Sequence, residues 1–511
     1  MTRIATVLVA ASLGLRSAFA FADAANPTVT VESGALAGAR AGTVEVFEGI
    51  PYAAPPVDAL RWEPPARPAN WTGTREASTF GPACPQWRNR STAALSSDRR
   101  QSEDCLYLNV WTFAAARKAP VMVWIHGGGF RSGSGSRRFY DGGDFARDGV
   151  ILVTINYRLG VLGFFAHPAL TAAAAPGAPL GNYGILDQIA ALSWVKRNIA
   201  AFGGDPDNVT LFGESAGGRS VLTLLALPAA KGLFSKAIVE SGEGWEPQKT
   251  LAEEERIGVA LALRLGLAHG ATPQQLRALP FERLLDAQAS LGRIVPFDDG
   301  RLIRISIAQA FAAGREIHVP LIIGSNSYEA SLMGSFHVSP AEEAARVPRS
   351  ARPLYPGAEA EVGRAFFTDS VMGAPARWFA SRASAAAPSY LYYYSYVPTA
   401  RRGTVAGAGH GAEIPFVFGS WPASYDHAAS AEDRAMETLM HGCWVAFART
   451  GRPACADGAW PAYRPKADEL MEFGVRSGPE ADPRGAQDDA LQRALLPIPP
   501  AADLTPGPAG P

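Results

Sequence analysis

Short apolar runs recur along the chain and alternate with segments whose apolar positions have helical spacing. Runs such as PVMVWI are apolar throughout, as expected for strands that are buried on both faces. Helical spacing in 184–200, 250–290 and 430–449 predicts helices. The predicted strands are short β segments within 29–52 and the runs 120–125, 150–156, 209–213, 237–241, 321–324 and 391–397. This alternation predicts an α/β fold with a large, mostly parallel central sheet flanked by helices.

The same pattern predicts one large domain. The chain contains no internal repeat of fixed period, and no Pro/Gly linker divides it before about residue 475. Residues 25–495 are therefore expected to form a single α/β domain. The stretch 496–511 (LPIPPAADLTPGPAGP) is rich in proline and is expected to be a disordered tail.

The first residues have the three parts of an export signal. Arg3 supplies the positive start, 4–15 is a short apolar run, and 18–20 (AFA) is a small-x-small cleavage site. We expect residues 1–24 to be a signal peptide, cleaved at about 20–25, and the protein to be secreted or periplasmic. No later stretch reaches the ~20 apolar residues of a transmembrane helix, so no membrane span is expected.

Composition and charge narrow the possible partners. Of the 511 residues, 47% are hydrophobic and 19% are charged, a mixture that can bury a large core. Lys and Arg number 47 and Asp and Glu 48, which leaves a formal net charge of −1. A balanced charge lacks the basic footprint of nucleic-acid binding, so no nucleic-acid partner is expected. Composition leaves the oligomeric state open.

Four cysteines remain after removal of the signal segment, namely Cys84, Cys105, Cys443 and Cys455. An even number in an exported chain favours two disulfides, with three possible connectivities. The short separations favour Cys84–Cys105 and Cys443–Cys455. Neither pair has CxxC spacing and no histidine cluster accompanies them, so no metal site is expected.

A nucleophile elbow is predicted where the strand 209–213 ends. Residues 213–217 (GESAG) have the form G-x-S-x-G, follow a strand and precede an apolar helix. The glycines permit a sharp turn that exposes the Ser215 hydroxyl at a helix N-terminus, where backbone amides favour negative charge. The alternative is an ordinary Gly-rich turn, but the strand–turn–helix context favours a nucleophile.

Donors for an oxyanion are predicted in the segment 126–130 (HGGGF), which directly follows the strand 120–125. The H-G-G-G form supplies oxyanion amides in esterases. We predict an oxyanion hole made by the amides of Gly128, Gly129 and Ala216. A plain glycine turn is the alternative, and the presence of both motifs in one chain disfavours it.

The acid and the base are expected to follow the serine, in that order. The histidines well downstream of it are His337, His410, His427 and His441. His410 lies in a Gly-rich loop soon after the strand 391–397, where a base is expected to project, whereas His441 is expected to pack within a helix. Glu329 is the only carboxylate in the turn after the strand 321–324. It is predicted to hold the imidazole and to stabilise the imidazolium.

These motifs resemble those of the type-B carboxylesterases, the family that includes cholinesterases and bacterial p-nitrobenzyl esterases. The similarity covers nearly the whole mature chain and includes the segments 48–53, 102–110, 126–130, 156–165, 181–218 and 410–419. It implies the α/β-hydrolase fold, with Ser215, Glu329 and His410 as nucleophile, acid and base, and it implies a disulfide between Cys84 and Cys105. The chain has Tyr-Glu-Ala at 328–330, where the family usually has Asp-Glu-Gly.

Aromatic residues are the candidates for the substrate pocket. Phe130 ends the HGGGF motif, Phe297 matches a family segment near the pocket, and Phe416 and Phe418 follow His410. Trp245, in a segment that aligns poorly with the family, is a further candidate. Such rings would make an apolar pocket of limited width, which favours neutral, soluble short-chain or aryl esters. For Phe416 and Phe418 a place in the core is an equal alternative.

The sequence therefore predicts an exported serine hydrolase that cleaves carboxylic esters of small molecules through an acyl-enzyme. No metal or organic cofactor is expected, because the chain has no P-loop and no G-x-G-x-x-G after a strand. Two alternatives stay open: a non-catalytic binding or adhesion protein of the same fold, and an amidase or carbamate hydrolase that uses the same residues.

Overall fold

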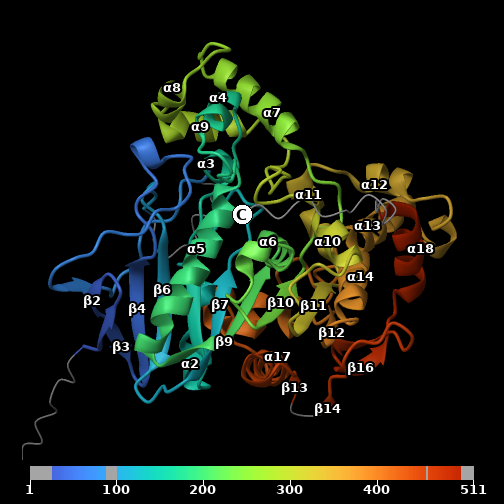
Figure 1. The fold of residues 1–511 in the computed structure, drawn as a ribbon. Coiled ribbons are helices and arrows are strands. Elements are labelled where there is room, and N and C mark those ends of the chain that lie inside the picture. The colour runs from blue at the N-terminus through green and yellow to red at the C-terminus, as the bar shows by residue number, and fades with distance from the viewer. Residues whose placement is uncertain (1–25, 88–99, 456–457, 497–511) are drawn as a thin grey trace, which may run out of the picture.

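An eleven-stranded sheet runs through the protein (Figure 1). The computed structural model describes residues 26–87, 100–455 and 458–496. The predicted signal segment 1–24 and residues 497–511 of the predicted tail lie outside the described residues. In spatial order the strands are β16 (Gly478–Ala481), β15 (Glu469–Phe473), β12 (Ser389–Tyr394), β11 (Leu321–Asn326), β10 (Lys236–Glu240), β9 (Gly204–Glu214), β7 (Ala119–Ile125), β8 (Ile151–Ile155), β6 (Tyr107–Phe113), β4 (Val44–Pro51) and β3 (Ala39–Ala41).

The adjacent strands from β15 to β8 are all parallel to one another, which confirms the mostly parallel sheet expected from the apolar runs. The edges differ, because β6, β4 and β3 on one side and β16 on the other run antiparallel to their neighbours. The short N-terminal β segments divide between two sheets. A separate small sheet is formed by β1 (Thr28–Val31), β2 (Gly34–Ala37) and β5 (Thr74–Glu76).

Helices cover both faces of the large sheet. On one face lie α5 (Tyr183–Asn198) and α6 (Ala216–Leu225), and on the opposite face lie α2 (Gly143–Arg147) and α17 (Ala431–Thr450). The other helices are α3 (Gly160–Gly163), α4 (Pro168–Ala173), α7 (Leu251–Arg264), α8 (Pro273–Arg277), α9 (Phe281–Gln288), α10 (Ile307–Ala312), α11 (Met333–Phe336), α12 (Pro340–Arg346), α13 (Glu359–Thr368), α14 (Ala374–Ala383), α15 (Ile414–Phe418), α16 (Trp421–Ser424) and α18 (Gly485–Leu495). Figure 1 shows α7, α8 and α9 together with α4 at the top of the view.

The segment 250–290, predicted to be helical, forms the three helices α7, α8 and α9. The first begins at Thr250, whose side chain caps it in a capping box, and ends before Gly266, whose backbone is left-handed. Pro273 opens the second helix, and Pro280 precedes the third. The interruptions are thus encoded by glycine and proline, which helix interiors disfavour.

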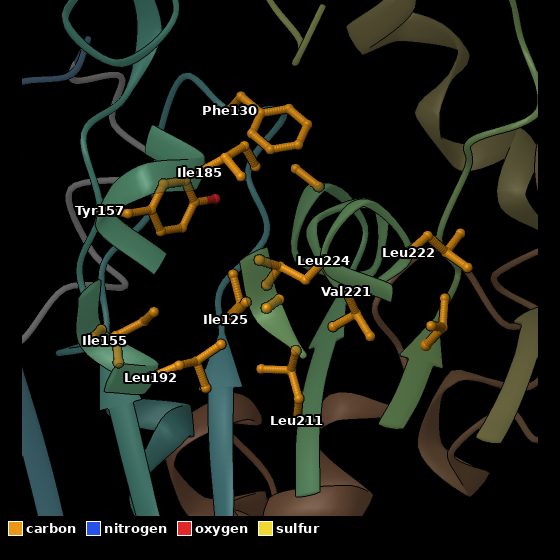
Figure 2. Packing of buried hydrophobic residues seen from close by; sticks show 14 of the residues in the cluster. Ile125, Phe130, Ile155, Tyr157, Ile185, Leu192, Leu211, Val221, Leu222 and Leu224 are labelled. Carbon is orange, nitrogen blue, oxygen red and sulfur yellow. The ribbon is translucent and has the colours of Figure 1, made fainter. Parts of the chain in front are cut away.

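Alternate side chains of each central strand enter different cores. In β7, Val123 and Ile125 pack on the face that carries α5 and α6, whereas Met122 and Trp124 pack on the face that carries α17. Figure 2 shows the first of these cores, with Ile125 and Leu211 of neighbouring strands lying near Val221 and Leu224 of α6. Full burial of such a side chain stabilises the fold by ~1.5–3 kcal/mol.

Two disulfides are formed among the described residues, Cys84–Cys105 and Cys443–Cys455. Both are the pairs that the short sequence separations favoured. The second joins α17 to β13 (Ala454–Cys455), which pairs with β14 (Gly458–Ala459). None of the helices in the described part of the chain is long and apolar enough to cross a bilayer.

The order of the strands places a crevice beside β7. After β7 the chain continues through α2 on one face to β8, whereas after the neighbouring strand β9 it continues through α6 on the other face. The loops that leave the carboxyl ends of these two strands therefore separate. Ligands of open α/β sheets bind at such a point.

Candidate active site

Ser215 occupies the turn between β9 and α6. Its backbone has φ 58° and ψ −122°, a conformation that residues other than glycine rarely adopt. The serine is partly exposed, whereas Glu214 and Ala216 on either side are buried. The turn thus lifts the hydroxyl out of a buried segment and places it at the N-terminus of α6.

The two glycines that flank this turn are required by packing. A Cβ atom on Gly217 would lie 2.0 Å from the carbonyl oxygen of Ile125, and one on Gly213 would lie 2.6 Å from the same atom. Either contact is far below van der Waals distance, so α6 could not approach the end of β7 with larger residues here. This close approach brings the serine turn against the loop that starts at His126.

The loop after β7 presents backbone amides to the same cavity. Gly128 and Gly129 have φ values of 111° and 62°, which glycine adopts without strain. Within the described part of the chain, the amides of Gly128, Gly129 and Ala216 donate to no acceptor. All three residues line one cavity with Ser215. They are therefore available to an oxygen atom of a ligand.

His126, at the start of this loop, holds it in place through its contacts with Tyr157 and Gly127. Its ring stacks on that of Tyr157 with a centroid distance of 4.5 Å, and its Nδ1 donates to the carbonyl of Gly127 at 2.8 Å. The Tyr157 hydroxyl donates to the carbonyl of His126 at 2.9 Å. Burial lowers the pKa of His126 to about 3, so the ring is neutral at ordinary pH. This histidine therefore supports the loop.

His410 and Glu329 are brought together from two distant loops. Nδ1 of His410 donates to Oε2 of Glu329 at 2.6 Å, and the Glu329 side chain is fully buried. Glu329 follows β11 and begins a short 3-10 helix, Glu329–Leu332. The backbone amide of His410 donates to the hydroxyl of Ser331 in that same short helix, at 2.9 Å. The histidine ring is thus fixed relative to the acid by both its side chain and its backbone.

The second oxygen of Glu329 has two further donors that the sequence reasoning missed. Oε1 accepts from the hydroxyl of Ser241 at 2.6 Å and from the backbone amide of Asn326 at 2.8 Å. Ser241 directly follows β10 and has a positive φ of 47°. Its position at the carboxyl end of a predicted strand was the available signal, but nothing in the sequence indicates which residue it contacts.

Glu214 lies beside Nε2 of His410, a contact that the sequence did not predict. Oε1 of Glu214 lies 2.9 Å from Nε2 of His410, although the pair is not aligned as a hydrogen bond. Burial acts to lower the pKa of His410, but the charges of Glu214 and Glu329 outweigh it and raise that pKa well above its ordinary value. Among the described residues no hydrogen bond joins Ser215 to His410.

A further buried carboxyl group belongs to Glu413, three residues after His410 in the chain. It accepts a hydrogen bond from the side-chain amide of Asn326. Burial and the charge of Glu214 raise the pKa of Glu413 to about 8, which favours its protonated form at neutral pH. Among the described residues the partners of the imidazole are Glu329 and Glu214, and Glu413 forms neither a hydrogen bond nor an ion pair with it.

The remaining candidates lie elsewhere or act as structural groups. His441 packs against the ring of Phe145 and donates from Nδ1 to the carbonyl of Val417 at 2.7 Å, as its helical position predicted. Nδ1 of His427 donates a hydrogen bond to the carboxylate of the adjacent Asp426, at 3.2 Å. His337 lines the cavity but contacts neither Glu329 nor His410 through a hydrogen bond among the described residues.

The cavity has a volume of about 1180 Å³ and includes Ser215, His410 and Phe130 in its lining. The other four aromatic candidates do not line it. Trp245 is buried in the core on the side of α6, and Phe297 is fully buried beside Gly181. The expectation that these residues form the pocket wall is wrong for this structure.

Phe416 and Phe418 require the same correction. Both belong to α15, and their rings pack in the core on the opposite face of the sheet, 5.9 Å from Tyr394 and 5.0 Å from Trp124 respectively. The helix begins only four residues after His410, yet it directs these side chains toward α17. The core alternative that the sequence left open is therefore the correct one.

The sheet order and the serine turn at the end of β9 define an α/β-hydrolase. The model of the carboxylesterase family matches residues 25–352 and 357–489. Fumonisin B1 esterase of Sphingopyxis macrogoltabida is 37% identical over 490 residues, which cover 88% of this chain and 86% of that protein. Para-nitrobenzyl esterase of Bacillus subtilis is 36% identical, covering 89% of this chain and 97% of that protein.

Solved structures agree with these relatives. A structure of PNB esterase has a TM-score of 0.82 and 34% identity, and covers 91% of this chain and 99% of its own. A carboxylesterase of Geobacillus stearothermophilus has a TM-score of 0.80 and 36% identity, and covers 91% of this chain and all of its own. The chain therefore belongs to the carboxylesterase family, as the type-B resemblance predicted, and it is a carboxylic-ester hydrolase.

Proposed function

We propose that Ser215 is the nucleophile of this esterase, that His410 is its base and that Glu329 orients the histidine. The observation that carries this proposal is the buried Glu329 carboxylate bonded to Nδ1 of His410, in the cavity that also holds the partly exposed Ser215. A carboxylate at this nitrogen fixes the ring tautomer so that Nε2 can accept a proton.

The reaction follows from these positions. Nε2 of His410 takes the hydroxyl proton of Ser215 while Oγ bonds to the ester carbonyl carbon. The amides of Gly128, Gly129 and Ala216 stabilise the charge that develops on the carbonyl oxygen. His410 then protonates the leaving alcohol as the ester C–O bond breaks, which leaves Ser215 acylated. Water repeats the sequence on the acyl-enzyme and releases the acid.

The Glu214 side chain must move away from Nε2 of His410 during this cycle. In the resting arrangement Nε2 of His410 faces Glu214, and the neighbouring carboxylates favour the protonated imidazole. Attack requires the neutral ring to face Ser215 instead. Catalytic hydrogen bonds often form only when substrate is bound, and an ester that enters the cavity beside Gly127 and Ser215 would displace the Glu214 side chain.

The test of this function is a pre-steady-state assay with p-nitrophenyl acetate. We expect a burst of p-nitrophenol equal to the enzyme concentration, followed by steady turnover. The Ser215→Ala variant should give neither phase while keeping its fold. A wild-type protein that is folded and shows no burst and no turnover on a panel of esters would support the non-catalytic alternative instead.

We also propose that the substrates are soluble short-chain or aryl esters of small molecules. The two relatives described above, which are named as esterases for fumonisin B1 and for para-nitrobenzyl compounds, support an ester of a small molecule as the substrate. The test is kcat/KM for p-nitrophenyl esters from acetyl to palmitoyl, together with an emulsified triglyceride. A maximum at the longest chains, with a rate increase above the micelle threshold, would identify a lipase.

Export is the last part of the proposal: residues 1–24 direct secretion and are removed, and 25–495 form one catalytic domain. The two disulfides support an oxidising compartment. Mass spectrometry of the N-terminus, on protein from the periplasm or medium, should find cleavage at about 20–25. An intact Met1 on protein that stays in the cytoplasm would contradict export.

A further inference from the structure

The cavity around Ser215 contains more positive than negative charge. Its lining includes four arginines, Arg131, Arg137, Arg293 and Arg401, and two carboxylates, Glu214 and Glu243. The expectation of an apolar aromatic pocket did not include these arginines, which lie in the lining together with aromatic side chains such as Phe130 and Phe336. Because guanidinium groups remain charged at every ordinary pH, an uncharged substrate would leave this excess without a counter-ion.

Both carboxylates in the lining are already occupied. Glu214 contacts His410, as described above. Glu243 accepts from Arg293 and from the buried Arg219, and Glu246 lies beside the same two arginines. This group holds two arginines and two carboxylates, so it is neutral as a whole. The arginines left without a carboxylate at ion-pair distance, among the described residues, are therefore Arg131, Arg137 and Arg401.

Arg131 is the one best placed to bind an anion. It directly follows Phe130 at the end of the HGGGF loop and is partly buried. Its Nη2 donates to the carbonyl of Leu291, at 2.8 Å, and to that of Gly292, whereas Nε and Nη1 donate to no described residue. Burial lowers its pKa, and no neighbouring carboxylate opposes that effect.

We propose that Arg131 binds a carboxylate group of the substrate, so that the esterase prefers esters that carry a free carboxylate near the scissile bond. The inference rests on the proposed function, because the ester must reach Ser215. A guanidinium fixed through one nitrogen, with its other N–H groups free in a partly water-excluded cavity, is arranged for a charge-assisted bond to a carboxylate. Arg137, on the same cavity, adds a second uncompensated charge.

A purely structural role accounts for only part of the geometry. The bonds from Nη2 tie the oxyanion loop to the loop at 291–292, and a neutral amide side chain could make such bonds. A structural role gives no reason for a positive charge that is partly desolvated and has no carboxylate partner among the described residues. The two roles predict different results, because loss of a structural tie lowers the activity on all esters equally, whereas loss of an anion site lowers it only on charged ones.

The first measurement separates the inference from the proposed chemistry. The Ser215→Ala variant should bind mono-4-nitrophenyl glutarate about 10- to 100-fold more tightly than its neutral analogue 4-nitrophenyl valerate, by calorimetry at low salt. Equal affinity for the two esters would overturn the inference even if the wild type is an efficient esterase. A preference for the charged ester in this variant would stand even if Ser215 proved not to be the nucleophile.

The second measurement assigns the preference to one residue. The ratio of kcat/KM for the glutarate ester to kcat/KM for the valerate ester should be about 10- to 100-fold lower in Arg131→Gln than in the wild type. The ratio should fall less in Arg131→Lys, which keeps the charge. The matched control is Arg401→Gln, a change of an exposed arginine on the same cavity, which should alter the ratio less than threefold because water screens its charge. An equal loss on both esters in Arg131→Gln would make the residue a structural tie only.

The side of the ester that carries the carboxylate is settled by a second substrate pair, 4-acetoxybenzoate and its methyl ester. A preference for the glutarate ester alone places the carboxylate on the acyl side, and a preference for 4-acetoxybenzoate alone places it on the alcohol side. No preference in either pair would refute the proposal. If Arg131→Gln does not fold, the calorimetric comparison in Ser215→Ala still decides it.

Discussion

The imidazole of His410 is joined to the carboxylate of Glu329 by a 2.6 Å hydrogen bond, and Glu329 has no exposed surface. The two residues are separated by 81 positions in the chain. The acid also accepts from Ser241 and from the amide of Asn326. Both oxygens of the Glu329 carboxylate therefore accept hydrogen bonds, which offsets the cost of burying a polar group.

Replacement of Glu329 by glutamine should lower kcat/KM by about 10⁴, because an amide can present the wrong group to Nδ1 and cannot stabilise the imidazolium. Steady-state hydrolysis of p-nitrophenyl acetate measures the loss. Asp298→Asn is the control, because the Asp298 carboxylate bonds the backbone amide of Gly300 and not the histidine. A loss of less than tenfold in Glu329→Gln would mean that another carboxylate holds the ring.

Replacement of Ser215 by alanine should lower turnover by about 10⁴ to 10⁶, because the proposed nucleophile is lost while the proposed oxyanion donors remain. Circular dichroism should show an unchanged fold. Ser335→Ala, which alters another serine of the same cavity, should keep near-normal activity. Normal ester hydrolysis by folded Ser215→Ala would contradict the proposed mechanism.

Glu214 should set the acid limb of the pH profile. Because the charges of Glu214 and Glu329 outweigh burial and raise the pKa of His410, we expect kcat/KM to rise with pH through a pKa above the ordinary ~6.5 of histidine. In Glu214→Gln one of these charges is lost, so the apparent pKa should fall and activity should persist to lower pH. Glu243→Gln, in the same cavity, is the control. An unmoved acid limb in Glu214→Gln would contradict this assignment.

Gly217→Ala should abolish the correct approach of α6 to the end of β7, since the added Cβ would lie 2.0 Å from a backbone oxygen that cannot move independently. We expect loss of esterase activity and a lower melting temperature. Gly334→Ala is the control, because a Cβ there meets nothing within 4 Å. Full activity and stability in Gly217→Ala would mean that this packing is less tight than the structure has it.

The disulfide Cys84–Cys105 should stabilise the fold by about 3 kcal/mol, given its separation of 21 residues. Denaturant unfolding of the double variant Cys84→Ser/Cys105→Ser, compared with the wild type, measures this difference. Peptide mapping without reductant should recover the linked pair. Free thiols at both positions in folded, oxidised protein would refute the bond.

The parts of this protein that depend on local stereochemistry could be predicted from the amino-acid sequence. Ser215 and the glycines around it were recognisable because a turn with positive φ and a close helix–strand approach admit few residue types. The central strands were visible because strands buried on both faces must be apolar throughout. The fold class and the candidate residues Ser215, Gly128 and Gly129 follow from such signals, whereas Glu329 and His410 were predicted from the chain order of the fold and from the family resemblance.

Contacts between side chains of elements that lie far apart in the chain depend on how the folded chain packs. Phe416 follows His410 closely but enters the opposite core, because the rotation of α15 is set by its packing on α17. The contacts of Ser241 with Glu329 and of Arg131 with the loop at 291–292 likewise depend on how separate segments dock. Residue type limits what a side chain can do, but its partners are selected by the packing of the whole chain, and that packing gave the cavity its positive charge.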